Sequence, residues 1–132
     1  MYRCLIANRG EIAVRIIRAC RELNIETVAI YAKGDENSLH VSLADQAICI
    51  GEANPLDSYL NIDRIISAAK VTESNAIHPG YGFLSESTNF AKAVEDNHIH
   101  FIGPSKTTME MMGDKITARQ TVKQAGVPVI PG

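Results

Sequence analysis

The chain has 132 residues, enough for one domain with a single hydrophobic core. Its composition, 45% hydrophobic and 21% charged, is that of a globular protein and excludes a disordered chain. The formal net charge of -2 argues against a protein that binds duplex nucleic acid, and no apolar run is long enough to span a membrane.

Short β-rich runs alternate with helical stretches along the chain. In chain order we predict a strand at residues 2–7, a helix at 11–23, strands at 27–32 and 46–50, a helix at 61–71, a strand at 75–78, a helix at 88–96, a strand at 99–102, and helices at 105–113 and 114–125. Asn61 is the expected N-cap of the helix at 61–71. Strands that alternate with helices imply βαβ units, so the predicted fold class is α/β, a doubly wound and mostly parallel sheet.

The two ends of the chain and its cysteines indicate the cellular compartment of the protein and its domain organisation. The opening segment, MYRCLIANRGE, is charged too early to be a signal peptide. Cys4, Cys20 and Cys49 are widely spaced and fall within apolar runs, which favours small core residues of a reduced, cytoplasmic protein. The closing run VPVIPG is apolar and bracketed by prolines, a pattern that usually leads into another element. We therefore interpret residues 1–132 as one domain of a longer protein.

The first candidate loop follows the first predicted strand. A strand that enters a helix through Gly10 could place a phosphate at the helix N-terminus. The dinucleotide fingerprint needs three glycines, however, and only this one is present. We favour a structural interpretation, in which Asn8 caps the helix and Glu11 reaches back as its capping-box partner.

The second candidate loop, HPGYGFLSE (78–86), follows the strand at 75–78. Two glycines on either side of Tyr81 would let the backbone approach a ligand and leave the aromatic ring exposed. In the alternative interpretation the loop is a long turn, in which Ser85 or Ser87 caps the next helix and Phe83 and Leu84 fill the core. The residues by themselves leave both interpretations open.

Three further sets of residues are candidate sites. His78 ends a predicted strand and is expected to be a hydrogen-bonded packing residue rather than a general base. His98 and His100 lack a third ligand in sequence, so no metal site is predicted. Lys115 would occupy the first turn of a helix, where the helix dipole disfavours a cation. A phosphate clamp has this arrangement, but spacing alone favours an ordinary solvated lysine.

The helix at 11–23 carries two stripes of residues. An apolar stripe is expected to face the core, and it consists of Ile12, Ile16, Ala19 and Leu23. A charged stripe lies about 100° away on the helical wheel, and it consists of Glu11, Arg15, Arg18 and Glu22. From the residues alone the charged stripe is interpreted as a solvated face.

Five segments carry a resemblance to a known family: IANRGEIAVRIIRACREL, SYLNIDRIISAA, AIHPGYGFLSE, FIGPS and MGDKITAR. Together they resemble the N-terminal domain of biotin carboxylase, over essentially all 132 residues. This family includes the ATP-dependent component of acetyl-CoA carboxylase and the homologous modules of pyruvate and acyl-CoA carboxylases. The resemblance implies a Rossmann-like domain that precedes an ATP-grasp module.

The resemblance also implies an activity and its participants. ATP would phosphorylate bicarbonate to carboxyphosphate, and biotin on a carrier protein or domain would then be carboxylated and passed to a carboxyltransferase component. By position, Lys115 matches the lysine that contacts ATP, Tyr81 and Gly82 match the border of the biotin pocket, and Arg15, Arg18 and Glu22 match positions near a homodimer interface. The Mg²⁺ ligands and the catalytic residues are expected beyond Gly132, so the chain alone is not expected to be a catalyst. A eukaryotic relative would be mitochondrial.

Two alternatives come from other classes of protein. A nicotinamide-binding Rossmann domain requires the GxGxxG motif that NRGE lacks. The N-terminal domain of another ATP-grasp ligase is the main competitor, and the HPGYGFLSE loop argues against it.

Overall fold

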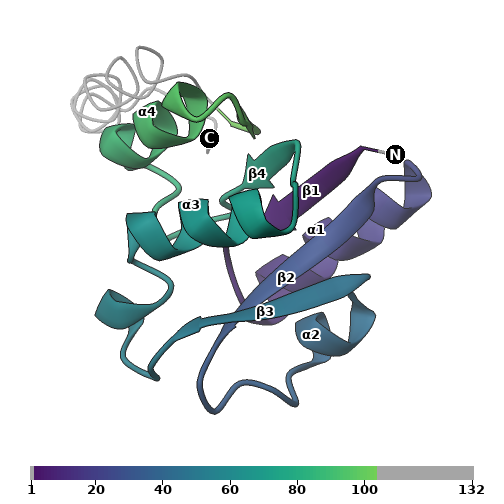
Figure 1. Ribbon diagram of the computed structural model, residues 1–132. Helices are drawn as coiled ribbons and strands as arrows, with labels where there is room; N and C mark the ends of the chain where they lie inside the picture. The colour runs from purple at the N-terminus through teal and green to yellow at the C-terminus, as the bar shows by residue number, and fades with distance from the viewer. Residues whose placement is uncertain (1, 104–132) are drawn as a thin grey trace, which may run out of the picture.

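The computed structural model describes residues 2–103 of the chain, in which five parallel strands form one sheet (Figure 1). The strands are β1 (Arg3–Ile6), β2 (Glu26–Ala32), β3 (Gln46–Gly51), β4 (Ala76–His78) and β5 (His100–Phe101), and their order in the sheet is β3-β2-β1-β4-β5. The helices are α1 (Gly10–Glu22), α2 (Leu39–Leu43), the 3₁₀ helix η1 (Pro55–Asp57), α3 (Ile62–Val71) and α4 (Thr88–Asp96). The predicted α/β class with a parallel sheet is confirmed.

Local signals located most of these elements. Asn61 is the N-cap of α3, and its side chain accepts a hydrogen bond from the Arg64 backbone N–H at 3.1 Å, as predicted. The short helices α2 and η1 were not predicted, because five and three residues are too few to show a helical repeat. The helices predicted at residues 105–113 and 114–125 lie outside the described residues.

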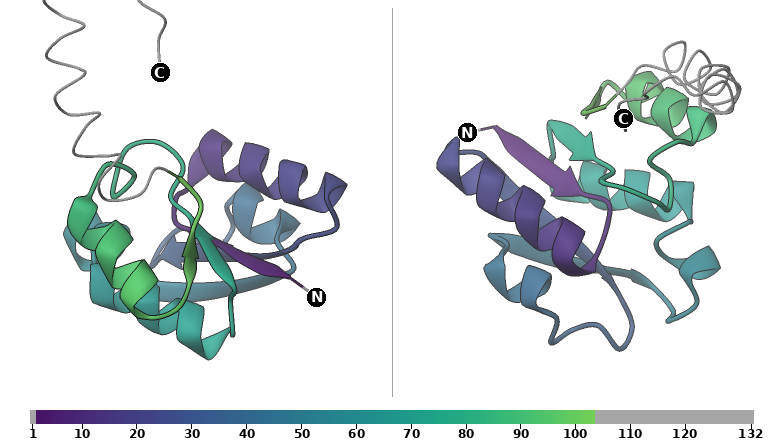
Figure 2. Two further views of the ribbon diagram at one scale, coloured as in Figure 1. Left: turned by 90° about the horizontal axis from the view of Figure 1, so that it is seen from above. Right: turned by 180° about the vertical axis from the view of Figure 1, so that it is seen from behind.

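The helices cover both faces of the sheet (Figure 2). Helices α1 and α2 lie on one face, and α3 and α4 lie on the other. The central strand β1 is buried on both sides: Leu5 belongs to the large core cluster shared with α3 and α4, whereas Ile6 packs with Ala13 and Ile17 of α1. This burial on two faces explains why β1 reads as a continuous apolar run.

Helix α1 does not bury the apolar stripe that its sequence predicts. The residues that face the sheet are Ala13, Val14, Ile17 and Cys20. In contrast, Leu23 is 71% exposed, Ala19 is exposed, and Ile12 and Ile16 are only partly buried. The apolar arc of this helix is wider than one stripe, and the sheet selects the part that carries the small residue Ala13. The predicted stripe is therefore wrong, and its outer members lie on the solvent face.

The cysteines also divide into two groups. Cys4 and Cys20 are buried, as predicted, but Cys49 is exposed. Cys49 lies on β3, one of the two edge strands of the described sheet, where Ile50 is the one buried residue. The prediction of a core position for Cys49 is wrong, because an apolar run at a sheet edge is covered on fewer sides than one at the centre. Within residues 2–103, no helix combines the length and the hydropathy needed to cross a membrane.

Candidate functional site

The strand order places a crevice between the carboxyl ends of β1 and β4. These strands are neighbours at the centre of the sheet, although more than 70 residues separate their paired positions. The chain leaves β1 for α1 on one face and leaves β4 for α4 on the other (Figure 2). In open α/β sheets, this is the switch point at which ligands bind. The two loops that meet there are residues 7–9 and residues 79–87.

Asn8 joins these two loops. Its side chain is buried, and its Nδ2 atom donates hydrogen bonds to the carbonyl oxygens of Pro79 at 2.9 Å and Tyr81 at 2.6 Å. Its Oδ1 atom accepts from the backbone N–H of Arg9 at 2.8 Å. Both N–H groups of the Asn8 amide therefore donate to the loop of residues 79–87.

The predicted capping box of α1 is wrong. The N-cap is Arg9, and no side chain caps the first turn. Asn8 precedes the N-cap by one residue, and its side chain bonds to the loop after β4 instead of to its own helix. Glu11 therefore has no capping partner. Neither residue pattern nor spacing reveals this, because a capping asparagine and a clamping asparagine look the same in sequence.

The loop 79–87 is held in a backbone conformation that glycine favours. The φ angles of Gly80, Gly82 and Phe83 are +66°, +68° and +45°. A Cβ on Gly80 would lie 2.8 Å from Ile12 Cγ2 and 2.9 Å from Asn8 Nδ2, so this glycine allows the loop to approach α1 closely. At Gly82, no described atom lies within 4 Å of the position that a Cβ would take. One glycine therefore serves packing, and the other leaves open space.

Tyr81 projects from this loop into solvent. Its side chain is 78% exposed, which confirms that the flanking glycines leave the ring free. The alternative interpretation of the loop is also confirmed: Ser87 caps α4 by accepting from the Phe90 N–H at 3.1 Å, Leu84 is buried, and Phe83 packs against the core. The same loop thus anchors itself at 83–87 and presents an aromatic ring at 81.

An aromatic and charged cluster supports the anchored end of the loop. The Phe83 ring stacks on Tyr59 with the ring centroids 5.3 Å apart, and the Arg9 guanidinium lies over both rings at 5.9 and 5.3 Å. Asp35 accepts a hydrogen bond from the Tyr59 hydroxyl at 2.8 Å and pairs with Arg9 at 3.5 Å. The hydroxyl also accepts from the Ala32 N–H at 3.0 Å. Burial raises the pKa of Tyr59, so its hydroxyl remains protonated and can donate to Asp35.

Sequence reasoning missed the members of this cluster. Arg9 comes after β1, Asp35 after β2 and Tyr59 after η1. No local sequence motif links the three residues. Their shared position at the carboxyl edge of the sheet is the signal that could have found them, once the strand order was known.

His78 ends β4 beside the same crevice. Its Nδ1 atom accepts a hydrogen bond from the Gly80 N–H at 3.1 Å, and burial lowers its pKa. It is therefore a hydrogen-bonded packing residue, as predicted, that fixes the first turn of the loop in its neutral form.

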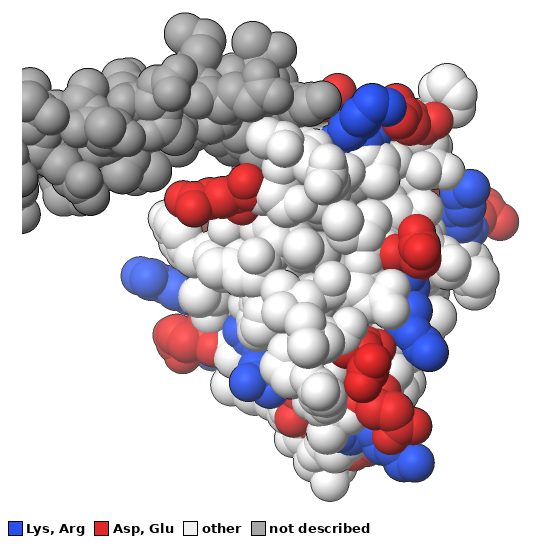
Figure 3. Space-filling view, turned by 90° about the vertical axis from the view of Figure 1, so that its left-hand side faces the viewer, with Lys and Arg blue, Asp and Glu red and all other residues white. Residues whose placement is uncertain are grey.

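Figure 3 views the molecule from the side toward which β1 points. Acidic and basic side chains are interspersed there around a broad region without charged groups. Within residues 2–103, no group of three or more His, Cys, Asp or Glu side chains is arranged to hold a metal ion.

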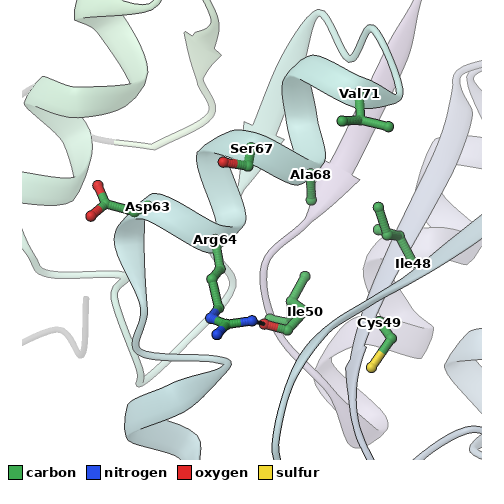
Figure 4. Close-up of a pocket in the computed structure, with 8 residues that line it drawn as sticks. All are labelled: Ile48, Cys49, Ile50, Asp63, Arg64, Ser67, Ala68 and Val71. Carbon is green, nitrogen blue, oxygen red and sulfur yellow. Dashed lines mark hydrogen bonds between the residues drawn. The ribbon is translucent and has the colours of Figure 1, made fainter.

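A pocket of about 270 Å³ lies elsewhere, between β3 and α3, where Arg64 extends toward the Ile50 carbonyl and donates to it at 3.3 Å (Figure 4). Neither Tyr81 nor Gly82 lines it.

The remaining predicted site residues are separate from this crevice. Arg15, Arg18 and Glu22 are exposed on the solvent face of α1, next to the exposed Ala19 and Leu23. Lys115 lies outside the described residues.

Residues 1–109 match the family model described as biotin carboxylase, N-terminal domain. The chain belongs to this family. It is 58% identical over 130 residues to biotin carboxylase 1 of Bacillus subtilis, an alignment that covers 98% of this chain and 29% of that protein. It is 54% identical to the pyruvate carboxylase of the same organism, over all of this chain and 12% of that protein. The chain thus spans less than a third of the length of these relatives.

Solved structures of biotin carboxylases share the fold. The biotin carboxylase subunit of a pyruvate carboxylase superposes with a TM-score of 0.82 at 56% identity, over 98% of this chain and 29% of that chain. The biotin carboxylase domain of the Hydrogenobacter thermophilus 2-oxoglutarate carboxylase gives 0.82 at 52% identity, over 98% and 28%; that structure is a domain dimer with MgADP, ADP and bicarbonate. The identity of the family sets aside the nicotinamide-binding alternative and that of a different ATP-grasp ligase.

Proposed function

We propose that this chain is the N-terminal domain of an ATP-dependent biotin carboxylase. The whole enzyme would use ATP and bicarbonate to carboxylate biotin on a carrier protein or domain, which then serves a carboxyltransferase component. The observation that carries the proposal for this domain is the exposed Tyr81 between two positive-φ glycines at the switch point of the sheet. Family membership supports the reaction, and the relatives' structures with MgADP and bicarbonate support the ligands.

Tyr81 and Gly82 are proposed to border the biotin pocket. The open space at Gly82 would let the ureido group of biotin come within hydrogen-bonding distance of the backbone. The Tyr81 ring would pack against the apolar part of the biotin ring system. Asn8 and the cluster around Arg9 act through the loop: they hold its two ends and leave residues 81 and 82 accessible. These side chains are positioning residues in this scheme.

Lys115 is proposed to contact the phosphates of ATP. A lysine ammonium is a compact positive charge that offsets the negative charge developing on a transferred phosphoryl group. The support is the match of MGDK to the family pattern. The Mg²⁺ ligands, the bicarbonate-binding residues and the catalytic base are proposed to lie in the part of the enzyme that would follow this domain.

The exposed face of α1 is proposed to form part of a homodimer interface. Arg18 and Glu22 carry opposite charges one helical turn apart, so a two-fold axis between them would place the Arg18 of each copy opposite the Glu22 of the other, with Arg15 beside the pair. The neighbouring Ala19 and Leu23 add apolar surface to the same face, which a purely solvated helix would not need. A related domain that forms a dimer is consistent with this assignment.

The test is biotin-dependent ATP hydrolysis by the full-length enzyme that contains this domain. Tyr81→Ala should raise the KM for free biotin at least severalfold, with the KM for ATP and the melting temperature close to wild type, because the ring is exposed. Tyr2→Ala is the matched control, since Tyr2 is also an exposed tyrosine but lies before β1, at the opposite edge of the sheet. An unchanged biotin KM in Tyr81→Ala would remove this loop from the biotin pocket. Absence of biotin-dependent hydrolysis in the wild-type enzyme would overturn the proposed function itself.

A further inference from the structure

Two of the three cysteines lie together in a small apolar cluster, away from the crevice. Cys4 on β1 is fully buried, and Cys20 in the last turn of α1 is 7% exposed. They form this cluster with Ala76, and partly buried isoleucines surround it. The Cys4 thiol donates to the backbone carbonyl oxygen of Leu5 at 3.7 Å. A strand and the helix that follows it thus bring two cysteine side chains into one buried cluster.

The two thiols differ in acidity. The neighbouring Cys4 side chain lowers the pKa of Cys20, which favours the Cys20 thiolate. The neighbouring Cys20 side chain and burial raise the pKa of Cys4. The thiolate is the nucleophilic form of cysteine, and Cys20 is also the member of the pair with some solvent access. Cys20 is therefore the reactive thiol, and Cys4 is placed to act second.

We propose that Cys4 and Cys20 are a peroxide-oxidisable dithiol that closes to an intrachain disulfide and ties α1 to β1. In the first step the Cys20 thiolate attacks hydrogen peroxide, its S–O bond forms as the O–O bond breaks, and hydroxide leaves. In the second step the Cys4 sulfur attacks the resulting sulfenic acid, the S–S bond forms as the S–O bond breaks, and water leaves with the Cys4 proton. The released hydroxide takes up one proton. The net reaction consumes two thiols and one peroxide and yields one disulfide and two water molecules.

The disulfide would act on the part of the domain that carries Asn8 and Arg9. It closes a loop of about 15 residues that contains the end of β1, both of these positioning residues and most of α1. Fixing both ends of this segment would resist the separation of α1 from the sheet. The exposed Cys49 lies on β3 outside the cluster, so it provides an internal reference thiol.

Peptide mapping of the 132-residue chain tests the proposal directly. Trypsin places the three cysteines on separate peptides: residues 4–9 (CLIANR), residues 19–21 (ACR), and residues 34–64, which contain Cys49. The folded chain is treated with hydrogen peroxide, its remaining thiols are alkylated with iodoacetamide in urea, and the digest is analysed by mass spectrometry without reduction. We expect CLIANR joined to ACR, with a mass two hydrogens below the sum of the free peptides, and loss of the link with dithiothreitol.

Three controls make the result decisive. In Cys4→Ala, Cys20 should be trapped as a sulfenic acid by dimedone, whereas in Cys20→Ala, Cys4 should remain an alkylatable thiol. Cys49→Ala should form the Cys4–Cys20 link at the wild-type rate, and a chain unfolded in urea should form it severalfold more slowly. If a core variant fails to fold, the wild-type digest still decides the question.

Several outcomes would overturn the proposal. Cys4 and Cys20 could both stay alkylatable at a peroxide dose that oxidises Cys49, or the links formed could involve Cys49. Equal rates in the folded and unfolded chains would show that the fold does not pair the thiols. The oxidised chain should also unfold at a higher urea concentration than the reduced chain, and a lower midpoint would show that the disulfide does not fit the folded state.

Discussion

The side-chain amide of Asn8 donates to the carbonyl oxygen of Tyr81 across 2.6 Å, between loops that are 73 residues apart in sequence. A second hydrogen bond to Pro79 makes Asn8 the link between the end of β1 and the loop that follows β4. Because the Asn8 amide is buried, removing it leaves carbonyl oxygens of the loop without their hydrogen-bond donor. The position of the exposed Tyr81 ring therefore depends on the buried side chain of Asn8.

Replacing this amide should destabilise the domain. Asn8→Ala leaves two carbonyl oxygens without their donor and should lower the free energy of unfolding by about 1–3 kcal/mol. Asn8→Asp should cost at least as much, because a carboxylate has no donors and would face the same two oxygens. Urea unfolding of each variant is the measurement. Asn37→Ala, in an exposed loop, is the control and should change stability by less than about 0.5 kcal/mol.

The two glycines of the loop should respond differently to the same substitution. Gly80→Ala and Gly82→Ala both place a Cβ at a positive φ angle, which costs roughly 1–2 kcal/mol. Only the Cβ at residue 80 would also collide with Ile12 and Asn8, which adds roughly 1–3 kcal/mol of overpacking. Gly80→Ala should therefore unfold at a clearly lower urea concentration than Gly82→Ala. Equal midpoints would contradict the close approach of the loop to α1.

His78 should make the domain less stable as the pH is lowered below the usual pKa of a histidine. Burial lowers its folded-state pKa below the usual 6.5, so the unfolded state binds a proton that the folded state resists. Above about pH 7 both states are neutral and the group has no effect. As the pH falls through 6.5 toward the lower folded pKa, the unfolded state gains protons first and stability is lost.

This pH effect can be isolated by comparing urea midpoints at pH 7.5 and 5.5. His78→Asn keeps an acceptor for the Gly80 N–H but does not titrate, so it should show a smaller loss of stability at low pH than the wild type. His100→Gln, an exposed histidine on β5, serves as the control and should retain the wild-type loss. A wild-type pH dependence in His78→Asn would assign the effect to other groups.

Lys115→Gln in the full-length enzyme tests the proposed contact with ATP. A charged hydrogen bond contributes about 1.5–3 kcal/mol, so the KM for ATP should rise roughly tenfold to a hundredfold. Thermal stability should hold, because glutamine keeps the length and helix propensity of the side chain and removes a cation from the first turn of the predicted helix. Lys106→Gln is the control lysine. An ATP dependence equal to wild type would return Lys115 to the role of a solvated side chain.

Charge reversal on α1 tests the proposed dimer. Arg18→Glu places a like charge against the acidic residues of the opposing copy and should weaken dimerisation of the full-length enzyme severalfold, more at low than at moderate salt. Arg21→Glu reverses a charge on the same helix outside the stripe and is the matched control. Sedimentation equilibrium measures both constants. The same dimerisation constant in Arg18→Glu and wild type would show that the stripe is only solvated.

The sequence predicted what depends on neighbours along the chain. The caps at Asn61 and Ser87 bond to backbone N–H groups three residues away, so spacing alone reveals them. The strands and the longer helices follow from periodicity, and the exposed ring of Tyr81 follows from its two glycines. The family segments carried the resemblance for the same reason, since each is a contiguous run of residues.

Tertiary structure alone decided which residues meet across the sheet. Asn8 fits the pattern of a helix cap, but the pairing of β1 with β4 offers it two carbonyl oxygens that its own helix cannot match. Cys49 lies in an apolar run like Cys4, yet strand order places one at the edge and the other at the centre. The cluster of Arg9, Asp35 and Tyr59 likewise exists only once three loops converge. Burial and long-range hydrogen bonds depend on strand order, and strand order is a property of the whole sheet rather than of any segment within it.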